Sequence, residues 1–170
     1  MIPSPNQIHK SLPPGIAIAA TPDFTNWKMD IQVLDNNPLY ADQIYRLNFK
    51  FSQSYPIEAP EVTFIKEENR EIPMHPHIYS NGVICLDLLG TNWSPVQNVE
   101  SVCMSIQSML TSNTKNGVFP IYPMTALDPL LYGQQLTGLC IERPPGDETF
   151  VRSGYRSPRN INFVYDDNTV

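Results

Sequence analysis

The chain has 170 residues, of which 41% are hydrophobic, and a formal net charge of −6. This length fits one domain with one core, and the acidic balance argues against nucleic acid or an anionic membrane as a partner. The three cysteines, an odd number, and the absence of a leader with a basic start and an apolar middle predict a reducing compartment, cytoplasmic or nuclear. No window is apolar enough to predict a membrane-spanning helix.

Four prolines interrupt residues 1–15, so no regular helix is expected there. Apolar and polar residues then alternate through residues 27–34 and 45–51, and two apolar residues flank a threonine in residues 62–64. This period of two predicts strands with one buried face. Because the connections are short, antiparallel hairpins are favoured over crossover helices, and we expect an antiparallel meander.

Residues 98–110 predict the best helix of the chain. Asn98 is a suitable N-cap and Glu100 suits the positive first turn of a helix. Apolar residues repeat at helical spacing, namely Val99, Val102, Cys103, Ile106, Met109 and Leu110. Packed behind the sheet, this apolar stripe would close the core.

Residues 113–142 are too apolar for an ordinary solvated loop, yet their three prolines argue against a regular element. A loop of this length without structure is uncommon in a compact domain. Further along, residues 147–155 are compatible with a short helix. From about residue 156 the chain has few aliphatic residues, which predicts a mobile tail.

The candidate site lies in residues 75–95. His75-Pro76-His77 is followed by the turn signal Ser80-Asn81-Gly82, then by Cys85 at the end of an apolar run, and later by Trp93-Ser94-Pro95. Asn-Gly favours a sharp reversal, which would fold the two histidines back alongside the cysteine. A thiol beside hydrogen-bond donors on an irregular, partly open loop suits acyl-thioester chemistry, because the thiolate is the nucleophile and the donors face an oxyanion.

This order of motifs closely resembles the active site of the ubiquitin-conjugating enzymes, which carry His-Pro-Asn, an Asn-Gly turn, Ile-Cys-Leu and Trp-Ser-Pro. Proline-rich stretches at residues 13–15, 55–60 and 144–145 agree with the resemblance. It implies an α/β fold of the ubiquitin-conjugating (UBC) type over residues 1–170. That fold is a four-stranded antiparallel meander packed on a long helix, with the active cysteine in an extended loop.

Two features are similar to one branch of the family. His77 stands where most members have Asn, and the chain contains the ending Tyr165-Asp166-Asp167. Members of this branch attach ubiquitin to the α-amino group of substrates with disordered N-termini. Many lysine-modifying relatives also carry an acidic residue just after the helix, and residues 111–115 contain none.

The resemblance also implies a role for each site residue. Ubiquitin would arrive from a ubiquitin-activating enzyme as a thioester, and a RING- or U-box-type ligase would guide its transfer to an acceptor amine. The activating enzyme consumes the ATP, so we expect neither cofactor nor metal here. The implied roles are Cys85 as nucleophile; His77 as oxyanion donor or loop support; His75, Pro76 and Asn81 as loop-structuring residues; and Ile57, Trp93, Ser94 and Pro95 as the ligase-binding surface.

Several alternatives stay open. A cysteine in an Ile-Cys-Leu run is usually a small buried hydrophobe, which is also the expectation for Cys103 and Cys140. His75, His77 and a cysteine could hold zinc, although the spacing is unusual and a fourth ligand is missing. The chain could be a non-catalytic adaptor of the same fold, or it could conjugate another ubiquitin-like protein.

Two segments depart from the family. Residues 1–15 form a shortened start where relatives have a basic amphipathic helix, and residues 113–142 replace a connection of a few residues. The longer segment is either a real insertion or a translated intron.

Overall fold

The computed structural model describes residues 12–35, 37–113, 117–120, 137–140 and 143–154. The expectations for most of the proline-rich start, for much of residues 113–142 and for the tail therefore lie outside the described residues.

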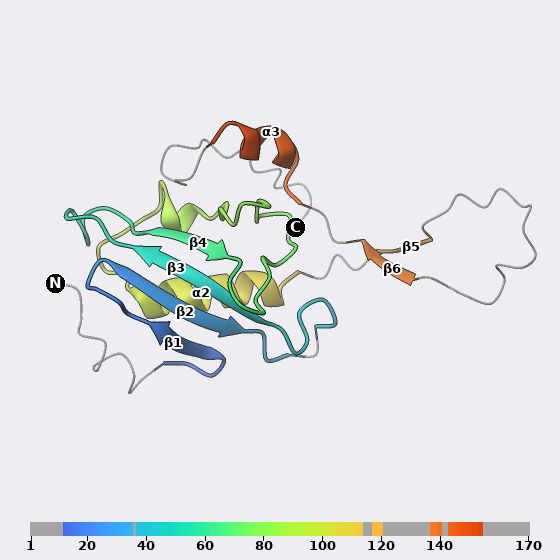
Figure 1. The fold of residues 1–170 in the computed structure, drawn as a ribbon, viewed down its shortest axis with the longest axis horizontal. Helices are drawn as coiled ribbons and strands as arrows, with labels where there is room; N and C mark the ends of the chain where they lie inside the picture. The colour runs from blue at the N-terminus through green and yellow to red at the C-terminus, as the bar shows by residue number, and fades with distance from the viewer. Residues whose placement is uncertain (1–11, 36, 114–116, 121–136, 141–142, 155–170) are drawn as a thin grey trace, which may run out of the picture.

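Four strands form one antiparallel sheet in the order β1-β2-β3-β4, so the predicted meander is confirmed (Figure 1). The strands are β1 (Ile16–Ala20), β2 (Asn26–Gln32), β3 (Ile44–Lys50) and β4 (Glu61–Ile65). The pattern of residues had indicated the last three individually, but not β1. In β1 every residue is apolar and only Ile16 is buried, so the sequence there has no period of two.

The register places the alternating apolar residues of β2, β3 and β4 on one face. Met29 pairs with Leu47, which pairs with Phe64, and all three side chains are buried. Side chains of a strand point alternately to opposite faces, so the residues between them form a polar outer face. The sheet therefore has one face for the core and one face for solvent.

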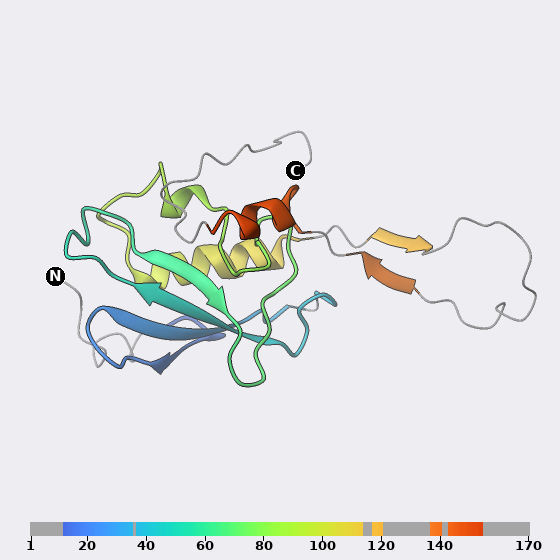
Figure 2. The ribbon, with the colours of Figure 1, turned by 45° about the horizontal axis from the view of Figure 1, so that its top comes forward.

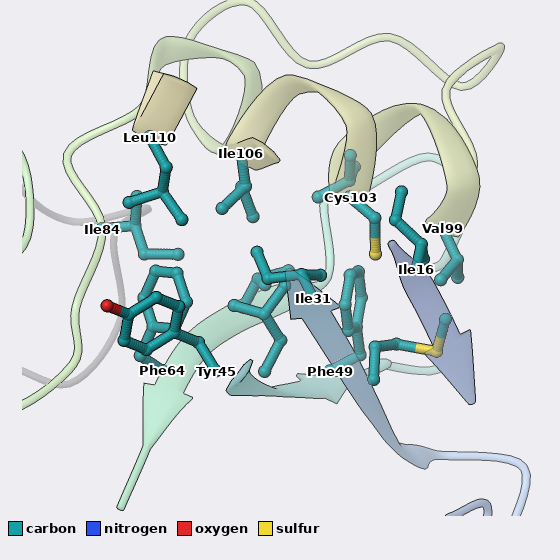
Figure 3. Packing of buried hydrophobic residues seen from close by; sticks show 14 of the residues in the cluster. Ile16, Ile31, Tyr45, Phe49, Phe64, Ile84, Val99, Cys103, Ile106 and Leu110 are labelled. Atoms are coloured by element: carbon teal, nitrogen blue, oxygen red, sulfur yellow. The ribbon is translucent and has the colours of Figure 1, made fainter. Parts of the chain in front are cut away.

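Helix α2 (Val99–Thr111) covers the core face, and Figure 3 shows Cys103, Ile106 and Leu110 pointing at the strands. Asn98 caps it as predicted, because its side chain accepts a 2.9 Å hydrogen bond from the Ser101 N–H. The Ser101 hydroxyl in turn accepts from the Asn98 N–H at 3.0 Å, which completes a capping box. Burying one such aliphatic side chain contributes about 1.5–3 kcal/mol, so this stripe is a main source of stability.

The outer face carries an ion-pair network centred on Arg46, whose side chain is only 9% exposed. Its guanidinium donates to both carboxylate oxygens of Asp30, at 2.8 and 3.1 Å, and to Glu67 at 3.1 Å. Arg70 also binds Asp30, at 2.7 Å. Alternation predicted that Arg46 lies on the polar face. Its burial there follows from its tertiary partners. The hydrogen bond to Asp30, and then the bond to Glu67, raise the pKa of Arg46.

The remaining elements are a 3₁₀ turn η1 (Asp87–Leu89), β5 (Gly117–Pro120), β6 (Thr137–Cys140) and α3 (Asp147–Arg152). Strands β5 and β6 pair antiparallel in a small sheet of their own, so the expectation that prolines exclude regular structure from residues 113–142 is wrong. Pro120 ends β5, and in a two-stranded sheet both strands are edge strands, where proline is tolerated. Helix α3 agrees with the short helix expected there.

Helix α3 lies beyond β4, at the opposite end of the strand order from β1, in both views of the ribbon (Figures 1 and 2). Among the described residues, no helix has the length and apolar character needed to cross a membrane.

Candidate active site

Residues 75–85 form a tight hairpin attached to the edge of β4. The Cys85 N–H donates to the His77 carbonyl at 2.8 Å, and the Tyr79 N–H donates to the Val83 carbonyl at 2.9 Å. An isolated bridge joins Val83 to Thr63 of β4. The turn predicted between the histidines and the cysteine is therefore present, and it brings the two segments side by side.

Gly82 makes this turn possible. Its φ is +87°, and a Cβ added there would lie 1.9 Å from the Phe64 carbonyl oxygen, which itself belongs to β4. Only glycine accepts both the left-handed backbone and the close approach. The Asn81 side chain accepts a 3.1 Å hydrogen bond from the Val83 N–H and so holds the turn from inside.

His75 ties the hairpin to the end of α2. Its Nδ1 accepts a 2.9 Å hydrogen bond from the His77 N–H. The ring proton therefore sits on Nε2, which donates to the Met109 carbonyl at 3.2 Å. Burial, helped by the nearby His77, lowers the pKa of His75 to about 4, so the ring is neutral. Both nitrogens face backbone groups, which leaves no free lone pair for a zinc ion.

The ring of His77 lies against the backbone of the cysteine. Its Nδ1 is 3.4 Å from the Cys85 carbonyl oxygen, so this weak contact requires a proton on Nδ1. The ring also meets His75 edge to face, with centroids 5.4 Å apart. Pro76, between the two histidines, fixes its own φ and offers no N–H. Within the described ranges, no three His, Cys, Asp or Glu residues cluster to hold a metal.

Cys85 is only 8% exposed, so its side chain is more enclosed than the partly open loop expected around it. The cysteine packs with Tyr79 and Val83 in a small cluster of its own, and Phe150 of α3 packs against this cluster. The rings of Phe150 and Tyr79 are stacked with centroids 3.8 Å apart. The cluster that encloses the cysteine thus receives a ring from a helix that follows the cysteine by more than sixty residues in the sequence.

Two polar residues fasten the α3 segment to the hairpin. Arg143 donates to the carbonyls of Pro73 at 2.7 Å and Ile78 at 3.0 Å, on either side of the histidines. Asp147 accepts a 2.7 Å hydrogen bond from the Ser80 N–H. Sequence reasoning did not select Arg143, Asp147 or Phe150. The prolines at 144–145, which agree with the family pattern, were the available signal.

The residues expected to bind a ligase meet on two neighbouring loops. The indole N–H of Trp93 donates to the Pro56 carbonyl at 2.9 Å, which joins the 55–60 loop to the 93–95 loop. Ile57 is 78% exposed, Pro95 is exposed and Ser94 is half-buried. Val96, 84% exposed, extends this surface and was missed, although an apolar residue next to Pro95 was a usable signal.

The other cysteines differ from Cys85 in their surroundings. Cys103 is fully buried on α2, and burial raises the pKa of its thiol to about 12, so it is unreactive. This agrees with its expected role as a core residue. Cys140 belongs to β6, and the structure describes only its backbone.

Comparisons with known proteins identify the family. The family model described as ubiquitin-conjugating enzyme matches residues 4–121. A probable ubiquitin-conjugating enzyme E2 W of Dictyostelium discoideum is 35% identical over 159 residues, which are 93% of this chain and 87% of that protein. The ubiquitin-conjugating enzyme E2 W of Caenorhabditis elegans is 43% identical over 110 residues, 63% of this chain and 70% of that protein.

A solved structure supports the same assignment. The crystal structure of ubiquitin conjugating enzyme E2 UbcA1 from Agrocybe aegerita matches with a TM-score of 0.69 and 35% identity, covering 88% of each chain. The chain therefore belongs to the ubiquitin-conjugating enzyme family, and the expected fold and enzyme class are confirmed. Enzymes of this family work with ubiquitin, an activating enzyme and ligases.

Proposed function

We propose that Cys85 carries ubiquitin as a thioester and transfers it to the α-amino group of substrate N-termini. The Cys85 thiolate attacks the thioester carbonyl on the activating enzyme, whose own cysteine leaves as a thiolate. The acceptor amine then attacks, a C–N bond forms, the C–S bond breaks, and the amine loses a proton. The reaction uses no cofactor on this chain, because the activating enzyme consumes the ATP.

The observation that carries this proposal is the placement of Cys85 in the hairpin. Its N–H is held by the His77 carbonyl, and an imidazole nitrogen lies 3.4 Å from its carbonyl oxygen. Cys103, by contrast, sits in the core with a raised pKa. Of the two thiols that the described ranges place, only Cys85 lies beside polar groups of a functional loop.

His77 would act either as a donor to the oxyanion or as a support of the loop. The contact with the Cys85 carbonyl favours loop support, while an imidazole N–H could also donate to an oxyanion formed at the thioester. His75, Pro76 and Asn81 would keep the hairpin in shape through the contacts described above.

The choice of acceptor follows from amine basicity. With pKa values of about 10.4 for lysine and about 7.7–8.0 for an α-amine, roughly a thousandth of the lysine is neutral at pH 7.4, against about a fifth to a third of the α-amine. Residues 111–115, just after the helix, contain no acidic residue. The protein therefore lacks one group that would favour deprotonation of a lysine acceptor. An α-amine needs less help to lose its proton.

The two joined loops would bind RING- or U-box-type ligases. Large exposed apolar side chains around a half-buried aromatic residue are typical of a partner surface. Ile57 and Val96 provide the exposed part, and Trp93, bonded to Pro56, provides the aromatic residue. Ser94 and Pro95 would line the same surface.

The test of the nucleophile uses activating enzyme, ubiquitin and ATP. Cys85→Ser should retain ubiquitin as an oxyester that resists thiols, because an alkoxide leaves poorly. Cys85→Ala should not be charged. A thioester on Cys85→Ala would assign the chemistry to another cysteine, and charging with a different ubiquitin-like protein alone would overturn the choice of ubiquitin.

The test of the acceptor compares discharge of the charged protein to three amines. A flexible peptide with a free α-amine and no lysine should react faster than free lysine and than the same peptide acetylated. A relative with Asn at the position of His77 is the control, since α-amines are favoured by basicity alone. If both enzymes showed the same ratio of α-amine to lysine discharge, the proposed specificity of this protein for α-amines would be wrong.

A further inference from the structure

One guanidinium bridges the backbone on either side of the two active-site histidines. Arg143 donates from Nη1 to the carbonyls of Pro73, at 2.7 Å, and Ile78, at 3.0 Å. Its Nη2 donates to the carbonyl of Ile72 at 3.3 Å. Residues 72 and 73 lead into the hairpin, and Ile78 follows the second histidine. The guanidinium therefore joins the chain before the histidines to the chain after them.

The next carbonyl along the chain, that of Met74, is held by a second side chain. The Tyr40 hydroxyl donates to it at 2.8 Å and accepts a 2.7 Å hydrogen bond from the Asn113 amide. Tyr40 is 1% exposed, and burial raises the pKa of its phenol, so the proton that this bond needs stays on the oxygen. Three consecutive carbonyls, of residues 72–74, thus accept from side chains that lie far away in the sequence.

The position of the His77 ring depends on the backbone on both sides of it. On one side, the His77 N–H donates to the His75 ring at 2.9 Å, and that ring bonds a carbonyl near the end of α2. On the other side, the Ile78 carbonyl accepts from Arg143. The contact between the His77 ring and the Cys85 carbonyl is long, at 3.4 Å, so a small shift of this backbone is enough to change it.

An arginine suits this arrangement better than a lysine. The guanidinium is planar and always protonated, and its N–H donors point in fixed directions. Charged donors form the stronger hydrogen bonds, and the half-buried position of Arg143 reduces competition from water. A lysine ammonium would keep the charge but not the fork in which two nitrogens serve three carbonyls.

We propose that Arg143 is a positioning residue of the active site, which holds the His77 ring at the Cys85 backbone and so sets the rate at which an acceptor amine discharges the thioester. This inference rests on the proposed thioester chemistry at Cys85. It makes the active site depend on a residue beyond residues 4–121, which the family model matches. Because Arg143 binds backbone carbonyls of its own chain, its loss should lower kcat and leave KM for the acceptor nearly constant.

The experiment measures discharge of the fully charged protein to a lysine-free peptide with a free α-amine. In Arg143→Ala, kcat should fall by about ten- to hundredfold, the effect that a misplacement of about 1 Å produces, with KM nearly unchanged. Arg143→Lys keeps a charged donor and should recover part of the loss. Guanidinium ion, added to Arg143→Ala at concentrations far below those that unfold proteins, should also raise kcat, whereas equal concentrations of sodium chloride should not.

Arg152→Ala is the matched control. Arg152 lies on α3, carries the same charge, and forms a 3.5 Å ion pair with Glu148 in which the two side chains are 82% and 86% exposed. Its kcat should equal that of the wild type. All assays are run well below the Tm of each variant, which separates a lost fold from a lost rate. If Arg143→Ala does not fold, Arg143→Lys decides, and a kcat equal to that of the wild type would then overturn the positioning role.

A double-mutant cycle tests whether Arg143 acts through His77. Once the ring is removed in His77→Ala, the further change Arg143→Ala should lower kcat by less than about twofold. Losses that multiply in the double variant would show that Arg143 acts on another group, and the inference would be wrong. A His77→Ala variant with the kcat of the wild type would overturn it as well.

The outcomes separate this inference from the function on which it rests. A wild type that is not charged, or a thioester on Cys85→Ala, overturns the proposed function. Normal charging and discharge of the wild type, with an unchanged kcat in Arg143→Ala, overturn the positioning role alone. A KM that rises in Arg143→Ala while kcat stays constant also overturns it, and assigns Arg143 to acceptor binding.

Discussion

Protonation of His75 should destabilise the fold in a pH range that begins well above the pKa values of most carboxylates. The ring is 5% exposed, accepts from the His77 N–H and donates to the Met109 carbonyl. Because its pKa falls from 6.5 to about 4 on folding, the unfolded chain binds a proton more readily between these values. The free energy of unfolding therefore decreases as the pH falls from about 6.5 to about 4.

The magnitude follows from the two pKa values of His75, 6.5 and about 4. At pH 7.5 the effect is negligible. At pH 5.0 nearly all of the unfolded chains carry the proton and few of the folded chains do, which costs about 2 kcal/mol. Below pH 4 the cost would approach about 3.5 kcal/mol, since each pKa unit corresponds to about 1.4 kcal/mol.

The assay is urea unfolding of the wild type and His75→Gln at pH 7.5 and pH 5.0. Glutamine cannot titrate, so its pH dependence reports all other groups, and the difference between the two proteins isolates His75. The wild type should lose about 2 kcal/mol more than the variant on acidification. Equal losses of unfolding free energy in the two proteins would refute a neutral imidazole that forms two hydrogen bonds, whatever the stability of the variant at pH 7.5.

Three further predictions concern other parts of the structure. Gly82→Ala should destabilise the protein by about 3 kcal/mol or more and abolish charging, because the new Cβ meets the Phe64 carbonyl at 1.9 Å. Thermal unfolding and the charging assay would detect both effects, and a fully active variant would contradict them. Phe150→Ala should uncover Cys85 and speed its alkylation by iodoacetamide several-fold, which an unchanged rate would disprove. Arg46→Ala removes the charged hydrogen bonds to the half-buried Asp30, which keeps Arg70 as its partner, and should cost about 2 kcal/mol in urea unfolding, against a loss below about 0.5 kcal/mol if the network is unimportant.

Local patterns in the sequence were sufficient for most of the scaffold. Strands β2, β3 and β4 and helix α2 can be predicted from the sequence because burial on one face imposes a period of two residues in a strand and of 3.6 in a helix. The Asn98 cap and the 80–82 turn are also local, since each depends on hydrogen bonds or φ angles within a few residues. Strand β1 was not predicted because it is apolar on both faces, and β5 and β6 were not predicted because the three prolines of residues 113–142 argued against regular structure there.

The sequence by itself also determined the family and the position of the candidate nucleophile, because the motif around Cys85 is short and contiguous. Only the tertiary structure decided how that cysteine is surrounded. Phe150 packs against the cluster that contains it, and Arg143 and Asp147 form hydrogen bonds that hold its hairpin; all three lie beyond the residues that the family model matches. Contacts between residues more than sixty positions apart leave no periodic trace along the chain, because they depend on where folding places two surfaces rather than on which residues are neighbours.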